Sequence, residues 1–316
     1  MKKLFFILSA AVMMTACQSG EEQLKQRAAE LCQFIPDHEL LERSADYMTA
    51  DFYAVLDTMF YRLPAHEAMD HEWLYYFVTG NGGTIADYEV EKVEQVDDNH
   101  AIATILVRQK WEDGSFDPDS DIEHHHLLME RVNGVWLMAD FDDHKADCIR
   151  YIANNRREQA RRDAISDYLV GEIGTLYTTG DLCIPTLMIV AEEAPATGSE
   201  ATQLCTIVYG DFWLYWYTLS GDTLRTVSGG NHAGRMTLTM QGDTPIVTAF
   251  EQTEDGARNE ASARRIFGKY FELYESMHAN ENVREAVRRE QLSEYVHRHN
   301  LSVRYYQDYG RPAVEL

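Results

Sequence analysis

The sequence predicts an α+β protein built from two domains. Apolar residues recur at helical spacing through residues 24–59, and they alternate between residues 85 and 141, which is typical of strands. The second half repeats the two patterns in the opposite order, with strands first and helices last. Helices and strands that are segregated along a chain favour antiparallel sheets covered by helices. A length of 316 residues fits two domains of about 150 residues each.

The N-terminal seventeen residues form a targeting segment rather than part of a fold. Met1-Lys2-Lys3 is positively charged, and the apolar run from Leu4 to Met13 is too short for a permanent membrane-spanning helix. Met14-Thr15-Ala16-Cys17 resembles the lipobox of bacterial lipoproteins. The resemblance implies cleavage before Cys17 and diacylation of its sulfur. Residues 1–16 are then a signal peptide, and residues 17–23 are a lipidated tether.

A lipid anchor at Cys17 would place the protein in the cell envelope, attached to the outer membrane. Glu21 and Glu22 follow the anchor closely and resemble the surface-export signals of Bacteroidetes lipoproteins, so the periplasmic and the outer surface both stay open. The formal net charge of −24 argues against nucleic acid as a partner and against electrostatic adhesion to anionic lipids. The expected partners are the membrane, through Cys17, and an unknown protein, small molecule or glycan.

The cysteines after the anchor leave the disulfide question open. They are Cys32, Cys148, Cys183 and Cys205, which allow three pairings that sequence cannot choose between. An exported protein can keep disulfides, but three of the four lie among apolar residues, which favours buried free thiols. The chain has no CxxC motif, so we expect no redox or zinc knuckle, no metal site and no cofactor.

The first domain, residues 24–155, is expected to place helices before a four-stranded antiparallel sheet. A tight hairpin turn is expected at Asn133-Gly134, between the last two strands. The expected helices cover residues 22–34, 37–62 and 65–77, and the expected strands cover residues 85–96, 101–111, 122–132 and 135–141.

This domain resembles the nuclear-transport-factor-2-like fold, which includes SnoaL-like proteins. The resemblance covers residues 22–155 and rests on the N-terminal helices and on the closing hairpin from Met129 to Phe141. It implies a cystatin-like cone, in which a curved sheet wraps the helices and encloses a pocket. We expect Trp136 to pack under the helices, near Leu56 and Met59. That fold carries enzymes and binding modules alike, so it leaves the function open.

The second domain, residues 156–316, is expected to be an antiparallel sheet with two C-terminal helices. The polar run at residues 154–157 marks the boundary, or alternatively one helix from Lys145 to Ile173 joins the halves. This half resembles uncharacterised Bacteroidetes lipoproteins that carry GDFW and SGG-x-H signatures, and the resemblance implies no activity. The expected strands cover 182–191, 203–219, 223–227, 236–240, 246–251 and 301–306, and the expected helices begin near Asn259 and Asn282.

Histidines in the first domain are candidates for chemistry. His124 and His126 share one face of an expected strand, and Asp140 lies near the end of the neighbouring strand. Asp142 and His144 follow close by. If that face lines the cone, these five residues form a metal or acid–base cluster; otherwise they are polar residues on a solvated face. His66 and His71 lie five positions apart rather than the four of the zinc-protease helix, which argues against zinc proteolysis.

Two other motifs lack parts that their chemistry needs. The acidic run at residues 117–121 lacks the glycine and glutamate of an EF-hand, so a solvated acidic turn is expected. The glycine-rich run at residues 228–234 holds Ser228 and His232, but no third group orients them as nucleophile and base. We expect this run to be a turn, with His232 as a candidate ligand-binding residue.

The aromatic run at residues 209–217 is the remaining candidate surface. Strand alternation puts one set of bulky residues on each face. Either both faces are core, or one is a stacking platform for a glycan or protein. One face of the run holds Phe212, Leu214 and Trp216, and the other holds Trp213, Tyr215 and Tyr217. We predict that the helix at residues 261–277 packs on the face with Phe212, Leu214 and Trp216.

These observations favour a lipid-anchored, non-catalytic binding module for an unknown ligand or protein. One alternative is a SnoaL-like small-molecule enzyme that uses His124, His126 or Asp140 in the cone pocket. The other is a surface lipoprotein for glycan capture or adhesion that uses the aromatic run.

Overall fold

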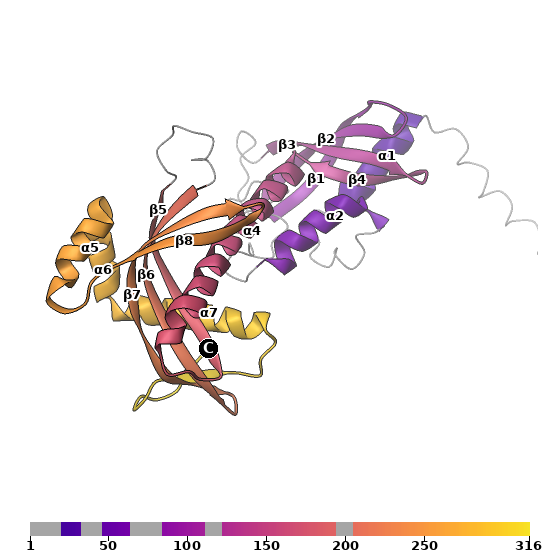
Figure 1. Ribbon diagram of the computed structural model, residues 1–316. Coiled ribbons are helices and arrows are strands. Elements are labelled where there is room, and N and C mark those ends of the chain that lie inside the picture. Colours follow the sequence, from indigo (N-terminus) through magenta and orange to yellow (C-terminus); the bar gives the residue numbers. More distant parts are fainter. Residues whose placement is uncertain (1–19, 33–45, 64–83, 111–121, 194–204) are drawn as a thin grey trace, which may run out of the picture. The chain divides into compact units, whose positions relative to one another are not determined.

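The computed structural model describes residues 20–32, 46–63, 84–110, 122–193 and 205–316 of the chain. The protein is an α+β protein with two sheets, and it divides into two compact units between Asn155 and Arg156. The polar run of the sequence lies at this division. Helix α4 (His144–Tyr168) runs through the same point, as the alternative with one continuous helix expected (Figure 1). Cys17, His66, His71 and the acidic run at 117–121 lie outside the described residues.

The first unit is an antiparallel sheet with helices against it. Its four strands follow the chain in order, and β2 and β3 are the inner pair. Helix α1 (Gly20–Cys32) lies against β1, and helix α2 (Ala50–Asp57) continues into the π-helical turn η2 (Thr58–Arg62). The strands are β1 (Thr84–Gln95), β2 (His100–Lys110), β3 (Ile122–Val132) and β4 (Val135–Phe141).

The core of the first unit follows from strand alternation and one tight turn. Asn133 and Gly134 have φ of 51° and 85°, the left-handed values that close the β3–β4 hairpin as the sequence predicts. Buried side chains of β2 pack with Phe52 and Leu56 of α2. Trp136 is only partly buried at the margin of this core. It therefore contributes less packing than expected for a side chain fully covered by the helices.

The second unit is built on one six-stranded sheet. Five of its strands lie in the order β10-β9-β7-β6-β5, and β8 pairs with the C-terminal part of β7, from Gly234 to Gln241. Neighbouring strands are antiparallel except β7 and β9, which are parallel over three residue pairs. The strands are β5 (Leu182–Glu193), β6 (Cys205–Ser220), β7 (Thr223–Gln241), β8 (Thr244–Gln252), β9 (Tyr305–Gln307) and β10 (Val314–Glu315).

Strand β7 is continuous where the sequence predicted a turn. The glycine-rich run at 228–234 lies inside it, and none of its glycines has a positive φ. The absence of a side chain at these glycines lets neighbouring groups approach the backbone closely, and the strand continues through them. A Cβ added at Gly229 would lie 2.2 Å from the Leu214 carbonyl oxygen, and one at Gly230 would lie 2.2 Å from the Tyr177 hydroxyl. The prediction of a turn was wrong because glycine also permits close approach of neighbouring groups.

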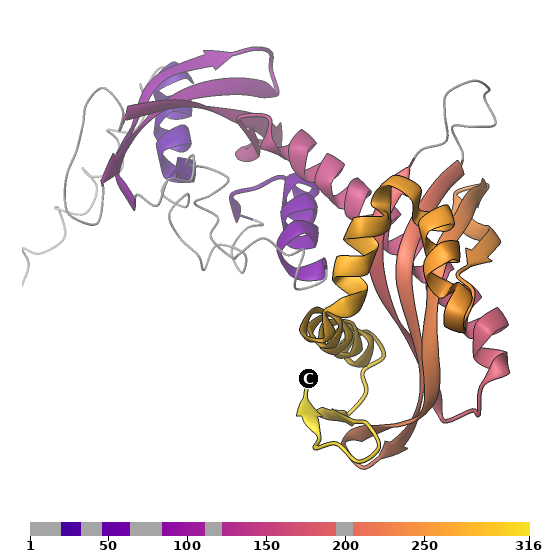
Figure 2. The same cartoon turned by 90° about the vertical axis from the view of Figure 1, so that its left-hand side faces the viewer.

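Helices cover both faces of strand β6 (Figure 2). The face with Phe212 and Leu214 packs on Ile165 and Leu169, at the end of α4 and the π-helical turn η3 (Leu169–Ile173). The opposite face packs on α5 (Asn259–Phe267), α6 (Phe271–Ala279) and α7 (Glu281–Arg298).

The predicted helix at residues 261–277 therefore packs on the other face of β6. Its side chains meet Tyr209 instead of Phe212, because α4 already occupies the Phe212 face. The predicted helix is divided into two helices, α5 and α6, because Gly268 between them has a φ of 52°. The second helix of the pair is followed by α7, whose N-cap is Asn280 and which is followed by Asn300 at a φ of 51°.

Candidate functional site

His124 and His126, the candidate histidines of the first unit, lie on its surface. The side chains of His124 and His126 are 55% and 59% exposed, and His124 Nδ1 lies 2.9 Å from Glu91. The residue between them, His125, has a side chain that is only 6% exposed. Of the two alternatives that the sequence left open, His124 and His126 thus follow the one with polar residues on a solvated face, because successive side chains of a strand point to opposite faces.

His125 is a buried histidine of this unit. Its ring stacks on Phe141 at 5.2 Å, its Nδ1 is bonded to Asp142, and its Nε2 lies 3.2 Å from Glu123. Leu127 and Met129 continue the same face of β3 and are also buried. His125 is thus part of the core packing at the end of the sheet.

The Asp140 side chain stabilises the turn between β4 and α4. Its carboxylate accepts hydrogen bonds from the backbone N–H groups of Phe141, at 2.7 Å, and Lys145, at 2.9 Å. Burial raises the pKa of Asp140 above its usual value, and these N–H groups oppose the rise. Asp140 is buried, whereas His124 and His126 are exposed, so the structure does not bring the three together as one cluster.

The aromatic side chains on one face of β6 form a covered row. Trp213 and Tyr215 lie 6.2 Å apart and Tyr215 and Tyr217 lie 6.1 Å apart, measured between ring centroids. Arginines of α7 lie over them, with Arg284 4.5 Å from the Trp213 ring and Arg288 3.9 Å from the Tyr215 ring. The reading of Trp213, Tyr215 and Tyr217 as an open stacking platform is therefore wrong. Cation–π contacts with α7 cover this face.

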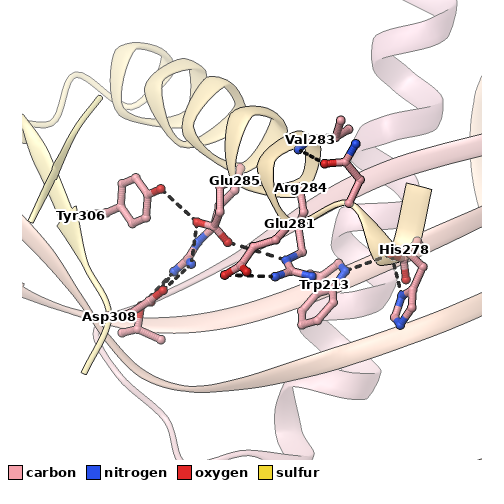
Figure 3. A network of polar contacts seen from close by, with 12 residues as sticks. Trp213, His278, Glu281, Val283, Arg284, Glu285, Tyr306 and Asp308 are labelled. Atoms are coloured by element: carbon pink, nitrogen blue, oxygen red, sulfur yellow. Dashed lines mark hydrogen bonds and ion pairs between the residues drawn. The ribbon is translucent and has the colours of Figure 1, made fainter. Parts of the chain in front are cut away.

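Arg288 is buried in a polar network with Asp308, and Figure 3 shows Asp308 with its neighbours Glu285 and Tyr306. The Arg288 side chain is 1% exposed, and two of its nitrogens each lie 2.8 Å from a carboxylate oxygen of Asp308. It also donates to the Tyr217 hydroxyl at 3.0 Å and to the Thr226 hydroxyl at 2.9 Å. A planar guanidinium suits such forked pairing. These bonds join α7 to β6, β7 and the segment after β9.

Asp211 is the second buried charge of this unit, with 0% of its side chain exposed. Its carboxylate accepts hydrogen bonds from Trp213 Nε1 at 3.2 Å, Asn231 Nδ2 at 2.5 Å and His278 Nδ1 at 3.1 Å. The donors come from β6, β7 and α6. A carboxylate this deeply buried needs such partners, and the three bonds stabilise it while fixing α6 on the sheet.

The Asp211–His278 contact is expected to make the stability of the second unit depend on pH. The hydrogen bond to Asp211 raises the pKa of His278, although burial and Arg284 oppose the rise. A raised pKa means that the stabilising contribution is fully present below the unfolded pKa of about 6.5 and is lost as pH rises through the folded pKa. Thermal unfolding of wild type and His278→Gln, compared at pH 6 and pH 8, checks this. The advantage of wild type should shrink at the higher pH, and an advantage that grows would contradict it.

His232 has a packing partner and no nucleophile. Its Nε2 shares a hydrogen bond of 2.8 Å with the Tyr177 hydroxyl, and the two rings meet edge to face. Burial lowers the pKa of His232 and raises the pKa of Tyr177. Ser228 donates to the carbonyl of Thr178 instead, at 2.5 Å. Ser228 and His232 are thus each tied to the segment before β5.

Cys32, Cys148, Cys183 and Cys205 are free thiols. Burial raises the pKa of Cys32 to about 12 and the pKa values of Cys148 and Cys183 to about 11. Within the described ranges, no group of three histidines, cysteines or carboxylates is placed to hold a metal ion. The helices of the described residues are all too short or too polar to cross a membrane.

A cavity of about 570 Å³ in the second unit is the site that sequence reasoning missed. It lies between α4, the edge strand β5 and α7, and we call it the β5 groove. Apolar side chains of β5 and η3 border it, and charged side chains of the two helices converge on it. Residues that line it include Arg162, Asp163, Asp167, Val170, Gly171, Cys183, Pro185, Leu187, Gln291, Glu294 and Arg298.

The walls of the β5 groove are tied together by polar side chains. Arg298 of α7 donates to Asp163 of α4 at 2.9 Å and so joins the two helices, whereas Arg162 donates to Glu158 within α4 at 3.2 Å. The one sequence signal for this place is Pro185, because proline within a strand is confined to edges and bulges. The rest of the groove depends on which helices flank that edge.

Comparisons with known proteins add little to this geometry. No protein-family model matches the chain, and no curated protein matches it. One similar solved structure is described as an Ntf2 like protein involved in plasmid conjugation. It is 11% identical, and the match covers 74% of this chain and 98% of that one, with a TM-score of 0.19. A likeness at that TM-score carries no argument about the fold or the function.

Proposed function

We propose that this protein is a lipid-anchored cell-envelope protein that binds a ligand in the β5 groove without transforming it. The observation that carries the proposal is the groove itself. Its volume of about 570 Å³ falls within the roughly 300–1,000 Å³ of typical ligand sites. Its lining is mixed, with apolar side chains of β5 and η3 on one side and polar or charged side chains of α4 and α7 around them.

The polar clusters elsewhere favour binding over catalysis. His125 and Asp140 are held by core and backbone partners, and Arg288 and Asp211 join helices to the sheet. A general base must reach a substrate proton, which needs an accessible atom beside a cavity. In the β5 groove, the Asp163 carboxylate is paired with Arg298 across the walls.

Gly171 gives a direct test of the groove. It lines the groove, and a Cβ added there would meet no other atom within 4 Å. Gly171→Trp should therefore fill the groove without disturbing the core. Saturation-transfer NMR with mixtures of dipeptides, monosaccharides and aromatic carboxylic acids should show binders to wild type that Gly171→Trp no longer binds.

The matched control is Gly20→Trp, at another helical glycine whose added Cβ meets no other atom within 4 Å. It should keep every binder, because it lies in α1 of the first unit. Binding that is equal in wild type and Gly171→Trp would place the ligand elsewhere and contradict the proposal.

The lipid anchor is tested by Cys17→Ser. The support for the anchor is the positive start, the short apolar run and the small residues before Cys17. Because two acyl chains supply most of the membrane affinity, Cys17→Ser should release the protein into the soluble fraction. Cys205→Ser, which changes a free thiol of β6, should stay with the membrane. Cys17→Ser protein found in the membrane pellet would show that the anchor is not at Cys17.

A further inference from the structure

Strand β5 is an open edge of the second sheet. It pairs with β6 from Leu182 to Glu193, and in the described part of the chain no strand pairs with its other side. Open edges present unpaired backbone N–H and C=O groups, which can pair with another extended chain. The β5 groove lies along this edge.

Gln291 occupies the position of a neighbouring strand at one point of the edge. Its Oε1 accepts a hydrogen bond of 2.8 Å from the Leu187 N–H, and its Nε2 donates a bond of 3.0 Å to the Leu187 carbonyl. A paired residue in an antiparallel strand makes the same two bonds. The side-chain amide thus shows that this edge binds a peptide-like group in plane.

The peptide groups of Cys183 and Pro185 point away from β6, in the same direction as those of Leu187. Antiparallel pairing alternates along a strand, and the β5–β6 register is unbroken from Leu182 to Ile189. Cys183 and Pro185 therefore direct their peptide groups away from β6, as Leu187 does. Both residues line the groove, where Cys183 offers an N–H and a carbonyl and Pro185 offers a carbonyl.

The charged side chains that line the β5 groove indicate the charge of the extended chain that could bind there. Asp163, Asp167 and Glu294 outnumber Arg162 and Arg298 among its charged lining residues. The whole chain carries a formal charge of −24, so two copies repel each other, which disfavours pairing of β5 with a second copy. A basic chain is attracted instead.

We propose that the ligand of the β5 groove is an extended, lysine- or arginine-rich segment of a partner polypeptide, which adds to β5 as a further strand. This inference rests on the proposed binding function. The segment pairs with Cys183 and Pro185 and displaces the Gln291 amide from Leu187. Main-chain pairing of this kind supplies affinity, and the flanking walls supply specificity.

The probe is a blocked peptide of alternating lysine and valine, about seven residues long and roughly 23 Å when extended. Two derivatives carry N-methyl groups at alternate amides, one on the lysines and one on the valines. Methylation removes the donors of one strand edge and leaves charge and side chains unchanged. Fluorescence anisotropy should show that the full-length protein binds the parent peptide and that one derivative binds at least tenfold more weakly than the other.

Variants of the protein test the same pairing from the other side. Gln291→Ala removes the internal competitor and should tighten binding of the parent peptide about tenfold, whereas Gln241→Ala, in the β7–β8 hairpin, should leave it unchanged. Gly171→Trp should abolish binding. A peptide in which glutamate replaces lysine should not bind.

Three results would overturn the inference. Equal binding of the two methylated peptides would mean adhesion by charge alone. An unchanged affinity of Gln291→Ala would mean that the peptide does not use Leu187. Dimerisation of Gln291→Ala in sedimentation velocity would assign the edge to a second copy. If the peptide fails while members of the small-molecule mixtures still bind wild type and not Gly171→Trp, only the polypeptide ligand is removed and the binding function stands.

Discussion

Arg288→Ala is expected to lower the free energy of unfolding of the second unit by about 3–5 kcal/mol, the cost of breaking a buried ion pair from one side. The variant leaves Asp308 without its forked partner and takes the hydrogen-bond donors away from Tyr217 and Thr226. It also uncovers the ring of Tyr215. Calorimetry of the full chain should show the loss in the transition that belongs to the second unit.

The neighbouring residue supplies the control for Arg288. Arg289 is exposed on the same helix, so Arg289→Ala should change stability by less than about 0.5 kcal/mol. The double variant Arg288→Met, Asp308→Leu removes both charges and should recover part of the loss, because replacing a buried pair by apolar residues is often close to neutral. Equal stability of Arg288→Ala and Arg289→Ala would show that the network does not hold α7 in place.

Phe267→Ala is the second large effect and should cost about 3–5 kcal/mol, as expected for a buried phenylalanine. Phe267 is buried at the end of α5, stacks on Tyr274 of α6 at 4.1 Å between centroids, and contacts Tyr209 of β6. The truncation would leave a cavity where two helices meet the sheet. Thermal unfolding followed by near-ultraviolet circular dichroism measures the loss.

An exposed residue of the same helical segment serves as the comparison. Leu273 is half exposed, so Leu273→Ala removes a similar apolar volume from a place where little is packed. Its effect should stay below about 1 kcal/mol. If both variants lost the same stability, the packing of α5 and α6 on β6 would not be the source of the effect.

The sequence predicted the local features whose cause is local. Asn133-Gly134 closes a hairpin because both residues tolerate the left-handed region, and Asn300 takes a positive φ just after α7 for the same reason. Alternation between residues 85 and 141 predicted the strands of the first unit, and the apolar stripe from Ala263 to Tyr274 predicted a buried helical segment. The α+β class followed from these patterns.

The faces of the strands were decided by tertiary packing. Residues 124–126 of β3 are all histidine and residues 127–129 are all apolar, so the sequence alone could not say which face turns inward. In the fold, the buried face holds His125, Leu127 and Met129. Strand β6 is bulky on both faces, so its sequence fitted a helix on either side. In the fold, α4 packs on the Phe212 face, and α5 and α6 pack on the Tyr209 face.

The β5 groove lay beyond what the sequence could predict. Its parts are ordinary by themselves: a proline in a strand, a glutamine on a helix and a glycine near a helix end. Leu187 and Gln291 are separated by 104 positions, and only the folded sheet brings the amide to the open edge. Local patterns determined which segments are helix and strand, because those depend on neighbouring residues. The edge, the covered faces and the groove depend on which elements meet, and that is set by the packing of the whole second unit.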